Sequence, residues 1–160
     1  MNVSKFAAPL LALAVIAAAC ASDQTTRNES GSIVEGGDLG VFVVQEGDCI
    51  NLPDSAEDLS SFTGVACDEP HDAQAFSLFD VADAELFPGE EVVQNQAQAG
   101  CIDRFETFIG LSYNSSIYFL QFVMPTEETW EAIDDRAVIC LVTPASGQDQ
   151  LTRDLRGIGE

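Results

Sequence analysis

The apolar residues of segment 87–110 recur with the period of a helix and predict the main helix of the chain. The positions that would face the core are Val93, Ala97, Cys101, Phe105 and Phe108. Glu90 and Glu91 fall in the first turn, where the helix dipole favours acidic side chains. Gly110 follows the last apolar positions and is a residue type that commonly ends a helix.

Shorter apolar stretches without this helical period predict strands. The stretches are 39–52, 73–81, 115–125 and 137–144. The first ends in a Gly-Asp turn that would place Cys49 at the end of its strand, and the last carries Cys140. One main helix with several strands in mixed order predicts a small α+β domain, with the helix packed on a mostly antiparallel sheet.

The segments between these elements are more polar. Thr126 can cap a short second helix over 126–134, in which Trp130 packs inward. Segment 53–67 predicts a loop or a short helical turn, and the tail 145–160 predicts either an edge strand or a frayed end.

The first 19 residues have the parts of an export signal. Lys5 supplies a charged start, and the apolar run over 6–19 is shorter than the roughly 20 residues that span a bilayer. A short anchor that is never cleaved is the alternative. We expect export.

Cys20 follows three alanines in a stretch that resembles a lipobox, with Ala17 where leucine is commonest. Acylation of Cys20 would leave a membrane-anchored lipoprotein on the extracytoplasmic side, and ordinary cleavage in the alanine run would release a soluble protein. Removing Cys20 leaves an even number of cysteines, which suits disulfides in an oxidising compartment. We therefore predict lipidation.

The polar segment after the lipidation site predicts a flexible tether over 20–37, because it is rich in Gly, Ser and Thr and lacks apolar periodicity. The folded extracytoplasmic domain is expected over 38–160, a length sufficient for one hydrophobic core.

The four remaining cysteines allow three pairings. We predict Cys49–Cys67, which would staple an early loop, and Cys101–Cys140, which would join the main helix to the last strand. In the chain-entropy model each closure stabilises the domain by roughly 3–4 kcal/mol.

The chain is strongly acidic, with 27 Asp and Glu against 6 Lys and Arg and a net charge of −21. Such a surface repels phosphate backbones and anionic lipid headgroups, so we expect no nucleic-acid partner. The charge serves either to bind cations or a basic partner, or to keep the surface solvated.

The segment CDEPHDAQAF (67–76) holds the only histidine, His71, among acidic neighbours. Zinc sites need three or four protein ligands, and one histidine beside cysteines that oxidise outside the cell does not supply them. No D-x-D-x-DG calcium loop and no G-x-S-x-G nucleophile motif occurs. We predict no metal, no cofactor and no catalytic residue.

His71 is predicted to be a hydrogen-bonded structural residue whose ring N–H is accepted by neighbouring carboxylates, which would raise its pKa. The alternative is a contact with a partner or ligand, shared with Asp68 and Asp72. Arg136 is expected to bond to backbone or carboxylate oxygens. Trp130 is expected in the core, with a groove-lining role as the alternative. These five residues are the candidate contacts.

The cysteine-containing segments together resemble a known family. GDCI, CDEPHDAQAF, the helix with Cys101 and Phe105, and the series of Pro125, Trp130 and DDRAVICLV are similar to the septum-formation domain family of actinobacterial lipoproteins and membrane proteins. The resemblance extends from about 41 to 157. It implies the two-disulfide fold and a link to division septa and the cell envelope. The chain does not resemble an enzyme family, and we expect no enzyme activity.

Two functions follow as expectations. The first is a non-enzymatic, membrane-tethered module that interacts with envelope or division proteins. The second is an envelope lipoprotein that binds a small ligand or a cation.

Overall fold

The computed structural model describes residues 24–53, 55, 59–82, 84–145 and 149–160. The predicted signal peptide and Cys20 lie outside the described residues. The two α-helices are α1 (Glu90–Ile109) and α2 (Glu127–Ile133), and the 3₁₀ turns are η1 (Val41–Val43) and η2 (Tyr113–Ser115). The strands are β1 (Thr26–Arg27), β2 (Ile33–Glu35), β3 (Gly37–Gly40), β4 (Cys49–Asn51), β5 (Ser61–Val65), β6 (Ala73–Asp80), β7 (Tyr118–Val123) and β8 (Ala137–Pro144).

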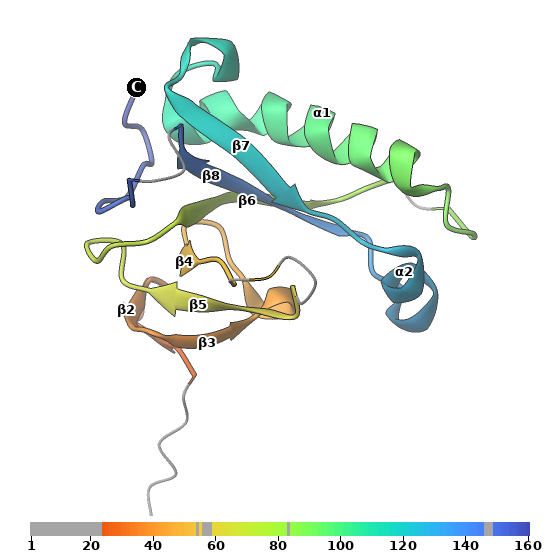
Figure 1. Cartoon of the computed structure of the whole chain (residues 1–160), viewed down its shortest axis with the longest axis horizontal. Coiled ribbons are helices and arrows are strands. Elements are labelled where there is room, and N and C mark those ends of the chain that lie inside the picture. The colour runs from red at the N-terminus through yellow and green to blue at the C-terminus, as the bar shows by residue number, and fades with distance from the viewer. Residues whose placement is uncertain (1–23, 54, 56–58, 83, 146–148) are drawn as a thin grey trace, which may run out of the picture.

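Six of the strands form one antiparallel sheet in the order β3-β5-β4-β6-β8-β7. Figure 1 shows α1 lying across β6, β8 and β7, while β3, β5 and β4 curve away on the opposite side of these strands. The predicted α+β class, with one main helix on an antiparallel sheet, is confirmed.

The sheet separates two apolar cores, and β8 contributes to both by strict alternation. Its Val138, Cys140 and Val142 face α1. Ile139 and Leu141 point the other way, into a second core closed by the β3–β5–β4 half of the sheet. Two-sided burial explains why the sequence of β8 is a continuous apolar run instead of an alternating one.

The main helix has the predicted inward face. All five predicted core positions, Val93, Ala97, Cys101, Phe105 and Phe108, are buried. Gly110 adopts a left-handed conformation (φ 87°) and donates its N–H to the carbonyl of Glu106, which ends the helix. Gly100 sits in the middle of α1 because a Cβ there would lie 2.3 Å from Cζ of Phe79.

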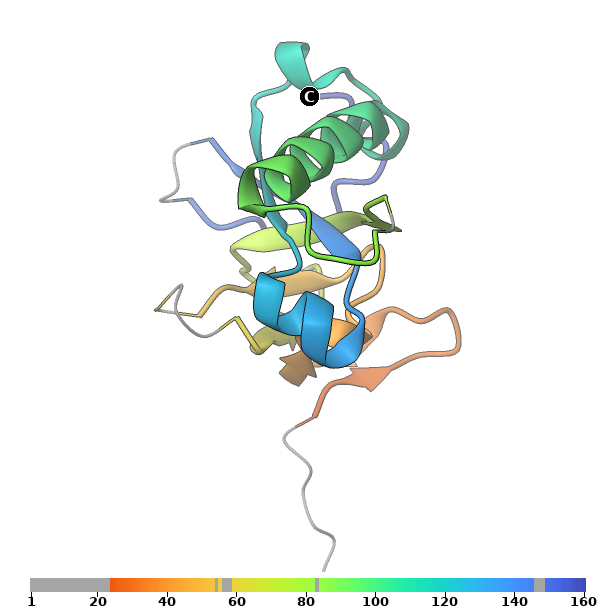
Figure 2. The same cartoon turned by 90° about the vertical axis from the view of Figure 1, so that its right-hand side faces the viewer.

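The second helix also forms as predicted. Thr126 accepts a hydrogen bond from the backbone N–H of Thr129, and the Thr129 side chain bonds back to the N–H of Thr126, which makes a reciprocal capping box. Trp130 is the buried residue of this helix. In Figure 2, α2 is the short blue helix that lies nearest the viewer.

Two predictions from the first half of the chain were wrong. The apolar stretch 39–52 is not one strand, since η1 separates β3 from β4 and a turn follows it. The polar segment 53–67 contains β5, which pairs with both β3 and β4. Phe62 and Val65 are its apolar anchors, and its other side chains are too small or polar to give a strand pattern.

The prediction of a flexible tether over 20–37 differs from the structure from Gln24 onward. The chain forms a β1–β2 hairpin that packs on the domain, with Ile33 buried in the second core. Arg27 bonds the buried carboxylate of Asp48, with Nη2 2.7 Å from Oδ2. The polar composition of this segment gave no sign of the packing, because the hairpin is held on the domain by one apolar side chain, Ile33, and by the Arg27–Asp48 ion pair.

The tail folds back over the domain instead of adding an edge strand or fraying. Leu151 makes an isolated antiparallel bridge with His71, and Leu155 is fully buried in the first core. No helix in the described part of the chain is long and apolar enough to cross a bilayer.

Both predicted disulfides are present. Cys49 and Cys67 are joined across 18 residues with a Cα–Cα distance of 5.2 Å. Cys101 and Cys140 are joined across 39 residues with a Cα–Cα distance of 5.6 Å, which fixes α1 to β8. The first bond stabilises the β4–β5 side of the sheet and the second stabilises the helix layer.

Candidate functional site

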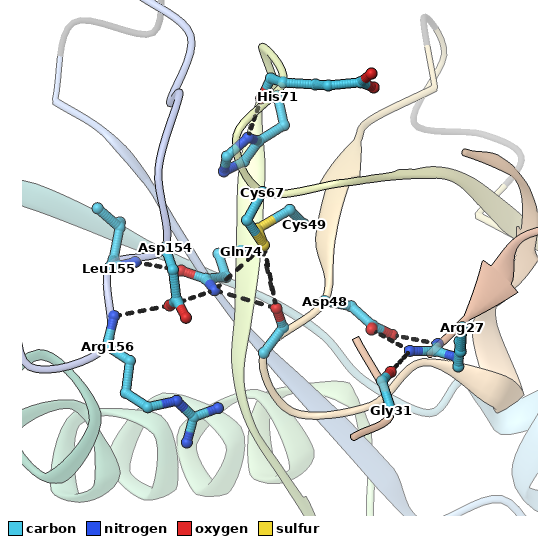
Figure 3. Close-up of a disulfide and its surroundings, with 12 residues drawn as sticks. Arg27, Gly31, Asp48, Cys49, Cys67, His71, Gln74, Asp154, Leu155 and Arg156 are labelled. Atoms are coloured by element: carbon cyan, nitrogen blue, oxygen red, sulfur yellow. Dashed lines mark hydrogen bonds and ion pairs between the residues drawn. A yellow bond between two sulfur atoms is a disulfide. The ribbon is translucent and has the colours of Figure 1, made fainter. Parts of the chain in front are cut away.

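The side chain of His71 is fully buried beside the Cys49–Cys67 disulfide (Figure 3). Its Nδ1 lies 2.7 Å from the backbone carbonyl of Glu69, so this nitrogen carries the proton and donates it. The prediction that a neighbouring carboxylate accepts the ring N–H was wrong. The buried ring is also not available to a partner, which corrects the alternative reading of His71 as a contact residue.

Burial lowers the pKa of His71 below its ordinary value of 6.5, because the charged ring would lose its hydration. The hydrogen bond to Glu69 and the charges of Asp72 and Asp154 act in the opposite direction but are weaker. The predicted upward shift was therefore wrong in sign. Nε2 is the acceptor-only nitrogen of the neutral ring; it is buried and has no hydrogen-bond partner among the residues that the structure describes.

Gln74 joins the disulfide region to the tail, and sequence reasoning missed it. Its Nε2 donates to the carbonyl of Gly47 at 3.1 Å and to Oδ1 of Asp154 at 2.8 Å. Its Oε1 accepts the N–H of Leu155 at 2.8 Å. Figure 3 shows this side chain between the disulfide and the tail. The available sequence signal was a glutamine inside a predicted apolar strand. When such a side chain is buried, its amide needs hydrogen-bond partners on several sides.

The two acidic candidates beside His71 separate in the structure. Asp68 is exposed at a turn. Asp72 accepts the N–H of Leu52 at 3.0 Å and the side-chain amide of Gln150 at 3.2 Å, so it holds the chain segments around it. In the described part of the chain, no group of three or more His, Cys, Asp and Glu side chains is placed to hold a metal ion.

Arg136 and Trp130 form one structural unit at the end of α2. The guanidinium carbon lies 3.6 Å from the centroid of the indole ring. Its Nη1 donates to the carbonyls of Trp130 and Asp135, and Nη2 pairs with Asp134. Trp130 is buried and also meets Phe87 edge to face. Trp130 thus belongs to the core, and Arg136 bonds backbone and carboxylate oxygens as expected.

A surface groove of about 660 Å³ is lined by residues of η1, of α2 and of the second core. Figure 2 views the molecule from the side of α2. We call it the η1–α2 groove. Its lining is largely apolar: Val41, Phe42, Leu59, Ser60, Leu78, Val123, Met124, Thr126, Glu128, Thr129, Asp135, Ala137 and Ile139.

The floor and the rim of this groove differ in exposure. Leu78 and Val123 are partly buried against the second core, so the floor continues the interior of the domain. Phe42 on the rim is 63% exposed. Leu59, in the segment that leads into β5, also lines the groove and is 38% exposed. An exposed aromatic side chain next to an apolar depression is typical of a surface that binds another protein.

The charges around the η1–α2 groove are acidic. Glu128 and Asp135 line it. Asp80 and Asp134 line an adjoining depression of about 490 Å³, which shares Phe42, Asp135 and Ala137 with the groove. Arg136 is the basic residue in this surface, and its guanidinium is held by the Trp130 ring and Asp134. Sequence reasoning missed the groove, because the residues that form it are distant in the chain.

The model of the family described as "Septum formation" matches residues 46–157, which include both disulfides, His71 and α2 and begin four residues after Phe42. No curated protein and no solved structure matches the chain.

Proposed function

The chain belongs to the septum-formation family, and from this premise we propose that it is a docking module of the dividing cell envelope. In this proposal the domain is non-enzymatic, is tethered by a lipid on Cys20 to the extracytoplasmic side of the membrane, and binds envelope or division proteins. The family relates the chain to septum formation, and the mode of action is our proposal.

The observation that carries the proposal is the η1–α2 groove. Phe42 is exposed above a floor formed by Leu78, Val123 and Ile139, which are continuous with the second core. Interface energy concentrates where an aromatic side chain fills an apolar pocket surrounded by polar groups. The groove provides such an arrangement, ready to be completed by a partner.

The surroundings of the reactive residue types support binding over catalysis. The ring of His71 is fully buried, and the four cysteines of the domain are joined in disulfides. Neither the imidazole nor a thiol is therefore presented to a substrate.

The folded N-terminal hairpin limits how far a lipid-anchored domain would stand from the membrane. Gln24, which bridges to Asp38, is four residues after Cys20. Four residues span at most about 14 Å. A lipid on Cys20 would thus hold the domain next to the bilayer, within reach of the extracytoplasmic parts of membrane proteins.

Fluorescence microscopy of dividing cells tests the proposal. The full chain is fused at its C-terminus to a fluorescent protein that matures outside the cytoplasm, and we expect enrichment at septa. Cys20→Ala should release the fusion from the membrane. Phe42→Ser should reduce septal enrichment, whereas Phe119→Ser, which changes a comparably exposed aromatic residue outside the groove, should not. Uniform membrane staining of the unaltered fusion would contradict the proposed function.

A further inference from the structure

We infer that the partner segment bound in the η1–α2 groove is a cationic one, in which an aromatic or branched apolar side chain is flanked by Lys or Arg. This inference rests on the proposed docking function and specifies the chemistry of the partner.

The apolar part of the inference comes from the groove itself. Its volume of about 660 Å³ is several times that of one large side chain, so it accommodates an apolar anchor together with its backbone. The exposed side chains of Phe42 and Leu59 line the groove together with the buried Ile139. An apolar anchor bound there would cover apolar surface that now faces water, which favours the complex.

The cationic part comes from the carboxylates around the entrance. Among the residues that the structure describes, Glu128 and Asp80 take part in no ion pair. Both are exposed: Glu128 lines the groove, and Asp80 lines the adjoining depression. Basic side chains on either side of an apolar anchor would reach them, and a negative surface also steers a positive segment toward it.

Other occupants fit this surface less well. A second copy of the chain would bring its own net charge of −21 against the same carboxylates. An anionic lipid surface would be repelled for the same reason. A cationic segment from a different protein removes this repulsion and adds attraction.

Selection from a displayed library of random 12-residue peptides measures the partner chemistry directly. The target is the full chain as the cell processes it, in detergent micelles, and the library is first depleted on the Phe42→Ser variant. We expect the enriched peptides to carry Phe, Trp, Leu or Ile next to Lys or Arg. Their affinities are then measured by fluorescence anisotropy.

Matched variants separate the groove from the rest of the surface. Phe42→Ser should weaken peptide binding by about 10-fold or more, as loss of a central aromatic contact does. Glu128→Lys should weaken it by about 5-fold or more and reduce its dependence on salt, because a carboxylate becomes a repelling cation. Phe119→Ser and Glu131→Lys, on β7 and on the same helix as Glu128, should leave affinity within about 2-fold, since these positions lie outside the groove.

The outcomes distinguish this inference from the proposed function. Enriched peptides that depend on Phe42 but are neutral or acidic would overturn the inference and leave a docking groove. Binding that is unchanged by Phe42→Ser and Glu128→Lys, or an absence of peptides that depend on Phe42, would overturn it as well. Septal enrichment of the fusion, measured separately, decides the proposed function.

Discussion

His71 and Leu151 exchange both of their backbone hydrogen bonds. The N–H of His71 donates to the carbonyl of Leu151 at 2.9 Å, and the N–H of Leu151 donates to the carbonyl of His71 at 2.8 Å. This pair joins the tail to the segment that follows Cys67, in which the imidazole of His71 is fully buried. His71 is thus a structural residue, whose backbone binds the tail of the chain.

The buried imidazole makes stability depend on pH. Its pKa is lowered in the folded state by burial, so the unfolded chain binds a proton more readily. The contribution of the neutral ring is complete above pH 6.5 and is lost as the pH falls from 6.5 toward the lower folded-state pKa. We expect the free energy of unfolding, measured with urea, to decrease as the pH is lowered from 7.5 to 5.5.

The control for this effect is His71→Gln, which has no titrating ring. The chain has one histidine, so the variant lacks the only imidazole that could titrate and should show a much smaller dependence over the same range. An equal decrease in both proteins would show that His71 is not its source.

Much of the fold could be predicted from local sequence signals. Helix α1 has an apolar face with helical period, an acidic first turn and a terminal glycine, and it forms as these features indicate. Thr126 and Trp130 mark α2 in the same way. The cysteine pairing followed from which elements could be joined, and the structure has the same pairs.

The features that were missed depend on contacts between distant segments. Asp48 and Arg27 are 21 residues apart, and their pairing is what turns a polar segment into a packed hairpin. Gln74 reaches Asp154 across 80 residues. Phe42 and Met124, which are far apart in the sequence, line one groove only in the folded domain, so no local pattern could identify it. The direction of the pKa shift of His71 was missed because its acidic neighbours in the sequence suggested an exposed ring, whereas the ring is buried.

The Arg27–Asp48 pair provides a test of the folded N-terminal hairpin. Arg27→Met should destabilise the domain by about 2–4 kcal/mol, because it leaves the buried carboxylate of Asp48 without its cation. Urea denaturation at pH 7 measures the change. Arg153→Met, which breaks the exposed Arg153–Glu160 pair, is the control and should leave stability within experimental error. Equal small effects of both substitutions would indicate that the hairpin does not contribute to the fold.

The Arg136–Trp130 contact can be followed through the single tryptophan of the chain. Arg136→Lys keeps the charge but loses the planar fork that stacks on the ring and reaches the carbonyls of Trp130 and Asp135. We expect the free energy of unfolding to fall by about 1–3 kcal/mol. In urea denaturation, the fluorescence emission of Trp130 should shift at urea concentrations below the main unfolding transition. Asp134→Asn removes the exposed partner and should cost about 0.5 kcal/mol or less. A lysine variant as stable as the wild type would show that charge alone suffices.

The two disulfides should contribute unequally because they close loops of different length. Replacing Cys101 and Cys140 by alanine opens a closure of 39 residues and should cost about 4 kcal/mol in the chain-entropy model. Replacing Cys49 and Cys67 opens a closure of 18 residues and should cost about 3 kcal/mol. Urea denaturation of the two double variants, with circular dichroism to follow the helix, gives both values. A larger loss for the Cys49–Cys67 variant would mean that the contacts around that bond, among them the Gln74 hydrogen bonds that hold the tail, matter more than loop length.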